Sequence, residues 1–112
     1  MIEIKQAGIY LANLDPVKVH EQSGCRPILI LQNDILNKNL NTVIVAPLTK
    51  NLTAKGHITT YFIDKRISKL NFDSVALLFQ IRTIDKIRIQ KHVSNLDETI
   101  MKRIKIQMAL MF

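Results

Sequence analysis

The chain is poor in several residues that would mark common classes of protein. It has no tryptophan, only 5% aromatic residues and a single cysteine among its 112 residues. One cysteine cannot form an internal disulfide, which fits a reducing compartment. No apolar stretch approaches the roughly 20 residues of a membrane-spanning helix, and the first residues, Met-Ile-Glu-Ile-Lys-Gln, do not resemble the apolar part of a signal peptide. These absences predict a cytoplasmic protein.

Acidic residues are also scarce. Nine Asp and Glu stand against sixteen Lys and Arg, which leaves a formal charge of +7. Such a charge favours a polyanionic partner, either nucleic acid, an acidic protein segment or a membrane surface. Solubility alone explains the excess of lysine equally well.

The residues that bind metals or nucleotide cofactors are not grouped in the sequence. The acids are scattered, the histidines lie far apart at positions 20, 57 and 92, and neither Cys-x-x-Cys nor His-x-x-x-His occurs. No carboxylate cluster suits two magnesium ions, and no glycine-rich loop leads into a helix. We therefore expect no metal site and no cofactor.

Apolar residues, 47% of the chain, support one packed domain over residues 1–112. Their grouping predicts strands at residues 9–14, 28–31, 42–48, 57–64, 74–81 and 88–93. Residues 34–41 suit a short helix capped by Asp34, 65–73 form a basic loop, and 82–85 close the fifth strand. Pro47 implies a strand end, an edge or a bulge. In the fourth strand, alternation puts four residues on one face: Ile58, Thr60, Phe62 and Asp64.

The end of the chain changes to helical spacing after Asp97, a suitable N-cap. The apolar residues there are Ile100, Ile104, Met108 and Met111. The predicted fold class is therefore mainly β with α (α+β): a small antiparallel β-barrel of five to seven short strands with one C-terminal helix.

A polar loop before the second strand contains the groups best suited to catalysis. His20 and Glu21 lie in it, and Arg26 stands where the loop meets the strand, held by Pro27. Thr49 follows another strand. RNA supplies its own 2′-OH nucleophile, so a protein need only move protons and neutralise charge on the phosphate, and arginine suits the second task.

Plainer interpretations of the same residues stay open. His20 can be a simple loop residue, Glu21 a partner for Lys18, and Thr49 a hydroxyl that bonds backbone. Cys25 beside an arginine suggests an activated thiolate, but an incidental small residue explains it more simply, because no general base is fixed next to it by the sequence.

Several motifs resemble the MazF/PemK (Kid) family of bacterial toxins, nearly from end to end. The similarity is strongest over residues 9–49 and 73–86. The matching motifs are Gly8-Ile9-Tyr10, Leu14-x-Pro16, His20-Glu21-Gln22-x-Gly24-x-Arg26-Pro27, Val45-x-Pro47-x-Thr49, Asp73-Ser74-Val75 and Gln80-x-Arg82-Thr83-Ile84-Asp85.

This resemblance implies a homodimeric, SH3-like barrel that cleaves single-stranded RNA at short sequences without metal. The products would carry a 2′,3′-cyclic phosphate and a 5′-OH. A cognate acidic antitoxin would inhibit the enzyme, and operator DNA would be bound only through that antitoxin. The resemblance assigns catalytic roles to Arg26, Thr49, Glu21 and His20, and RNA contacts to Gln22, Lys50, Asn51, Gln80 and Arg82.

The chain departs from the family pattern in places. Ala7-Gly8 replaces the usual Gly-Asp, and Val19 replaces a glycine. Some relatives carry an acid, treated as the base, where this chain has Phe79. Either Arg26, His20 or Glu21 then handles the proton, or activity is reduced. The alternatives are a non-catalytic binding protein, such as a gyrase poison on the same barrel, or a silent homologue that controls transcription with its antitoxin.

Overall fold

The computed structural model describes residues 2–14 and 24–112. Seven strands form one antiparallel sheet in the order β4-β5-β3-β2-β1-β7, and β6 pairs with β3 as well. The strands are β1 (Gly8–Asn13), β2 (Cys25–Ile30), β3 (Thr42–Thr49), β4 (Thr60–Ile63), β5 (Ser74–Leu77), β6 (Arg82–Asp85) and β7 (Ile89–Asn95). The helices are α1 (Asp34–Asn39), α2 (Lys65–Ser68) and α3 (Glu98–Ala109), with short 3-10 turns η2 (Leu52–Ala54), η3 (Leu78–Gln80) and η4 (Lys86–Arg88).

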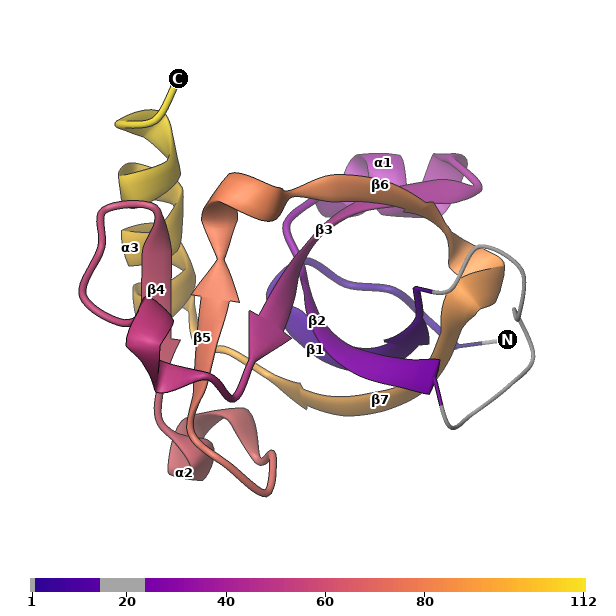
Figure 1. Ribbon diagram of the computed structural model, residues 1–112. Helices are drawn as coiled ribbons and strands as arrows, with labels where there is room; N and C mark the ends of the chain where they lie inside the picture. Colours follow the sequence, from indigo (N-terminus) through magenta and orange to yellow (C-terminus); the bar gives the residue numbers. More distant parts are fainter. Residues whose placement is uncertain (1, 15–23) are drawn as a thin grey trace.

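The sheet curls into an open barrel with an additional layer on one side. Strands β1, β2, β3, β6 and β7 curve around one interior, while α3 lies against the side formed by β4 and β5 (Figure 1). The predicted class, mainly β with a C-terminal helix on a small antiparallel barrel, is confirmed.

Two apolar cores lie on opposite faces of the central strands. Because side chains alternate along a strand, β2 sends Ile28 and Ile30 into the barrel interior and Leu29 toward the core beneath α3. The central strand β3 divides in the same way, with Val45 inside the barrel and Ala46 beneath the helix. Burial on both faces explains why these segments are apolar runs rather than alternating patterns.

The C-terminal helix is the element whose period was clearest in the sequence. Asp97 caps it as predicted, since its side chain accepts a hydrogen bond from Ile100 N at 2.8 Å. Ile104 is fully buried, Ile100 packs against the same core, and Met101, which the prediction left out, is buried too.

The first helix corrects one prediction. Asn33, not Asp34, is its N-cap and accepts from Leu36 N at 3.0 Å. Asp34 Oδ1 instead accepts from Gln6 N at 2.8 Å and from Asn37 Nδ2 at 3.2 Å. The carboxylate therefore ties the N-terminal segment to α1, a long-range contact that no local pattern reveals.

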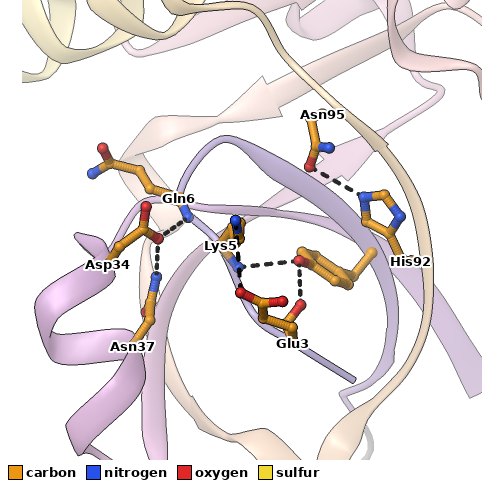
Figure 2. A network of polar contacts seen from close by, with 8 residues as sticks. Glu3, Lys5, Gln6, Asp34, Asn37, His92 and Asn95 are labelled. Atoms are coloured by element: carbon orange, nitrogen blue, oxygen red, sulfur yellow. Dashed lines mark hydrogen bonds and ion pairs between the residues drawn. The ribbon is translucent and has the colours of Figure 1, made fainter. Parts of the chain in front are cut away.

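Figure 2 shows how that segment is fastened to the barrel. The Tyr10 hydroxyl donates to Glu3 O at 2.9 Å and accepts from Lys5 N at 3.1 Å. Burial is the main reason that the pKa of Tyr10 is raised, so this hydroxyl remains protonated and keeps both bonds. The tyrosine ring also contacts His92 of β7 at 5.0 Å between ring centroids.

The predicted strand at residues 57–64 is shorter in the structure, where β4 covers Thr60–Ile63. It begins at Thr60 because the preceding residues form a turn, with Thr60 N bonded to His57 O at 3.1 Å. Tyr61 and Ile63 face the core beneath α3, while Ile58 is 61% exposed. Of the residues predicted to share one face, only Thr60 and Phe62 lie within β4, and the opposite alternation, Tyr61 and Ile63, is the one that packs beneath α3.

Two further segments differ from the prediction. The expected basic loop at residues 65–73 contains α2, capped by Asp64 through a bond from Arg66 N at 2.8 Å. The expected strand at residues 74–81 ends at Leu77, and the bend of η3 separates it from β6, which was predicted only to close it. The bend occurs because β5 pairs with the end of β3 and β6 with its beginning.

Candidate active site

Two of the predicted catalytic residues stand on neighbouring strands. Arg26 is the second residue of β2 and Thr49 the last of β3. The pairing of these strands ends at Ile28 and Pro47, and Arg26 and Thr49 each lie two residues beyond that last pair, at the same end of the two strands. Residues two apart share a face of a strand, so both side chains project from the barrel-interior face at one end of the sheet.

Arg26 is exposed on a fixed backbone. Its partner across the sheet is Ala12 of β1, which holds the residue in an extended conformation. Within the described part of the chain, the guanidinium makes one hydrogen bond, from Nη1 to its neighbour's carbonyl, Cys25 O, at 3.2 Å. Most of the planar donor group is therefore available for an anion, which it can bind through two parallel hydrogen bonds.

Thr49 presents a hydroxyl that is already oriented. Its Oγ1 accepts a hydrogen bond from Asn51 N at 3.1 Å. A threonine hydroxyl has one hydrogen and two acceptor lone pairs, so this bond leaves the hydrogen free to donate to a phosphate oxygen. The backbone is secured on the other side by pairing with Val75 of β5.

The predicted RNA-binding residues that follow Thr49 are exposed. Lys50 is the next residue, and Asn51 caps η2 by accepting from Thr53 N at 3.1 Å and from Thr53 Oγ1 at 2.7 Å. The carboxamide oxygen of Asn51 is thus occupied in shaping the turn.

Gln80 and Arg82 lie along β3 rather than beside Thr49. Arg82 pairs with Val45, four residues before Thr49, or about 13 Å along the strand at ~3.3 Å per residue. Gln80, the last residue of η3, is exposed between the two pairing regions. Such a spacing suits contacts with neighbouring nucleotides better than with one phosphate. His20, Glu21 and Gln22 lie outside the described residues.

The sequence interpretation missed Asn13, which pairs with Cys25, the residue before Arg26. This last residue of β1 is fully buried, and its backbone oxygen accepts from Arg88 Nη1 at 3.3 Å. The Asn13 side chain lies against Gly24, where a Cβ atom would be 3.4 Å from Asn13 Oδ1, an ordinary van der Waals contact. The available signal was a polar residue ending an apolar strand immediately before a predicted loop.

Cys25 lies next to the arginine without the character of a nucleophile. Burial raises the pKa of its thiol, and the nearby Arg26 charge only partly opposes that effect. A neutral thiol is a poor nucleophile, which agrees with an incidental role for this residue.

Among residues 2–14 and 24–112, no group of three His, Cys, Asp or Glu side chains is close enough to hold a metal ion. None of the helices in the same residues has the length and apolar character needed to cross a bilayer.

Comparisons with known proteins find relatives in sequence and in fold. The chain is 45% identical over 108 residues to the endoribonuclease MazF of Staphylococcus epidermidis, covering 96% of this chain and 88% of the relative. The Mycobacterium tuberculosis toxin MazF-mt6 has the same fold, with a TM-score of 0.76, 24% identity and coverage of 92% and 93% of the two chains. So does an endoribonuclease from a mycobacterial species in complex with its cognate antitoxin, with a TM-score of 0.75, 16% identity and coverage of 96% and 92%.

The fold and its strand ends thus define a class, a small basic β-barrel with an exposed arginine and a half-buried threonine at the same end of two neighbouring strands. The sequence model of the PemK-like, MazF-like toxins of type II toxin–antitoxin systems matches residues 5–112. This chain belongs to that family.

Proposed function

We propose that this chain cleaves single-stranded RNA at short sequences by attack of the 2′-OH on the adjacent phosphate, without a metal ion. The products are a 2′,3′-cyclic phosphate and a 5′-OH. Family membership and 45% identity to an endoribonuclease support the identity of the chain as an RNA-cleaving toxin. The observation that carries the mechanism is the position of Arg26 and Thr49, which lie two residues beyond the last pair of neighbouring strands, on the same face and at the same end of the sheet.

In this mechanism Arg26 neutralises the phosphorane. Attack by the 2′-OH places additional negative charge on the non-bridging oxygens, and a guanidinium held by a strand needs no rearrangement to meet it. Thr49 donates its hydroxyl hydrogen to one of the same oxygens. Charge stabilisation by fixed donors is often the largest contribution to rate in such reactions.

Proton transfer falls to one of three groups in our proposal. His20, Glu21 and Arg26 are the candidates for removing the 2′-OH proton and protonating the leaving 5′ oxygen. Gln22, Lys50, Asn51, Gln80 and Arg82 bind the RNA chain. Phe79 stands where some relatives carry an acid, but its hydrocarbon side chain cannot act as a base.

The experiment is to incubate the purified protein with a long defined RNA and with DNA of the same sequence, and to map the new ends. We expect cleavage of RNA alone, undiminished by excess EDTA, because the 2′-OH is the nucleophile. Loss of activity in EDTA that magnesium restores would contradict the mechanism. Intact RNA under all conditions would favour the non-catalytic alternatives.

We also propose a homodimer that acts in the cytoplasm. Beside α3, a hollow of about 450 Å³ is lined by Ile58, Ile106 and Leu110 together with Gly56, His57, Arg103 and Gln107, and Phe112, two residues after Leu110 in the chain, is 82% exposed. A patch of exposed apolar side chains with polar residues around it is typical of a protein interface. The patch would let two chains form one continuous basic groove.

The proposed inhibitor is a small acidic antitoxin whose disordered tail follows the RNA path and orders on binding. Operator DNA would be bound only through it. We expect the protein encoded beside this one to copurify with it and to block cleavage, with an affinity that falls as salt rises. Tight binding while RNA cleavage continues at full rate would place the partner outside the groove.

A further inference from the structure

We propose that Phe79 stacks on an RNA base beside the cleaved phosphate and so helps to select the sequence that is cut. This inference rests on the proposed function and assigns a ligand, an unpaired nucleobase, to Phe79, at whose position some relatives carry an acid.

The fold presents Phe79 at the edge of the candidate site. It is the middle residue of η3, which contacts β3 in the interval between the pairs Val45–Arg82 and Leu48–Ala76. Phe79 therefore lies alongside the strand that ends in Thr49, directly before the predicted RNA-binding residue Gln80.

The backbone of the turn is anchored while the ring is left in solvent. The preceding residue, Leu78, is fully buried in the core beneath α3, and Phe79 is 53% exposed. A 3-10 turn has about three residues per revolution, so the burial of Leu78 turns the next side chain away from the core. Because the turn is anchored by Leu78, a ligand that binds the ring does not have to order the backbone, which lowers the entropic cost of binding.

The surroundings of the ring match the chemistry of single-stranded RNA. Proteins read unpaired bases by stacking them on aromatic rings, while nearby cations hold the backbone. Phe79 has the polar Gln80 beside it and Arg82 three residues further on, and both are exposed. A phenylalanine ring offers no hydrogen-bonding group, so its contribution to RNA binding is a stacking surface.

The chain has few other aromatic rings that can serve this purpose. It contains six Phe and Tyr residues in total. Tyr10 is buried, and the ring of Phe62 is covered by Lys55 Nζ, 4.4 Å from its centroid. Phe112 is exposed but belongs to the apolar patch at the end of α3.

The test uses the RNA sequence at a mapped cleavage site, with a 2′-O-methyl group replacing the attacking 2′-OH so that binding is measured without cleavage. Affinities are compared for the wild type, Phe79→Ala, Phe79→Leu and Phe79→Trp, with Ile35→Ala as the control for loss of an exposed apolar side chain, since Ile35 is 75% exposed on α1. We expect Phe79→Ala to weaken binding by about 5- to 140-fold, the range for loss of one stacked base. Phe79→Leu should lose most of the same factor, and Phe79→Trp should retain affinity.

A second set of oligonucleotides locates the stacked base. Each carries one abasic nucleotide at a different position around the cleavage site. We expect a single position at which the abasic RNA binds wild type and Phe79→Ala equally well, because the partner of the ring is already missing there. In cleavage assays on unmodified RNA, Phe79→Ala should have a higher KM than the wild type and a weaker preference among sequences, whereas its kcat should change much less.

The proposal would be overturned if Phe79→Ala bound RNA as tightly as the wild type. It would also be overturned if Phe79→Ala bound every abasic oligonucleotide more weakly than the wild type by the same factor. A change in dimer dissociation or antitoxin affinity with RNA binding unaffected would overturn it as well, since the ring would then be a protein contact. Failure of the proposed function looks different, because the wild type itself would leave all RNA intact. In that case the Phe79 variants are compared for binding to a mixed-sequence single-stranded RNA, and equal affinity there would also refute the stack.

Discussion

Replacing Arg26 by alanine is expected to slow RNA cleavage by about a hundred- to a thousand-fold while RNA binding changes far less. The guanidinium acts mainly on charge that develops in the transition state, and removal of one such donor typically costs ~2.7–4 kcal/mol of barrier. The fold should be unaffected, since Arg26 is exposed and its bond to Cys25 O is local. The measurement is a single-turnover cleavage rate beside an RNA dissociation constant.

Two variants sharpen this result. Arg26→Lys should restore only part of the rate, because an ammonium cannot form the two parallel bonds of a guanidinium. Arg66→Ala is the matched control: Arg66 is exposed on α2 and paired with Asp64 at 3.1 Å, so its loss should leave the rate unchanged. A folded Arg26→Ala protein with wild-type activity would remove the central residue of the mechanism.

The largest effect on stability is expected from Ile104→Ala. Ile104 is fully buried where α3 packs on the sheet, in the same core as Leu29, Ala46 and Leu78. Replacing buried isoleucine with alanine removes apolar contacts and leaves a cavity, at a cost of about 2–5 kcal/mol. Since the free energy of unfolding of a protein is only about 5–15 kcal/mol, the urea denaturation midpoint of this variant should be clearly lower than that of the wild type.

The matched control for this variant is Ile35→Ala. Ile35 is also an isoleucine on a helix, but it is 75% exposed on α1 and lies outside the apolar patch of α3. It should change stability by less than about 0.5 kcal/mol. Both variants should be compared with wild type at one protein concentration, because dimerisation would contribute to stability. Equal midpoints for the two variants would show that α3 does not complete the core.

The sequence predicted elements best where one local rule dominated. Asp97 and the helical spacing after it identified α3, and the apolar run after Pro27 identified β2, because burial on both faces permits few polar residues. The motif around Arg26 identified the candidate site in the same way, since a loop that leads into a buried strand is readable from composition alone.

What the sequence could not decide depended on contacts between distant segments. Asp34 and Asn33 are both good capping residues, and only the approach of Gln6 gives Asp34 a different task. The apolar alternation in β4 had two possible buried faces, and the packing of α3 selected the one with Ile63.

The same division holds for the candidate site. Arg26 and Thr49 could be chosen from the sequence as residue types suited to a phosphate, but their common face follows from the antiparallel register of β2 and β3. The exposure of Phe79 follows from the bend at η3, where β3 passes from pairing with β6 to pairing with β5. By itself the sequence determined which groups are available for chemistry. Their relative placement was decided by strand pairing, because pairing joins residues whose separation along the chain carries no local signal.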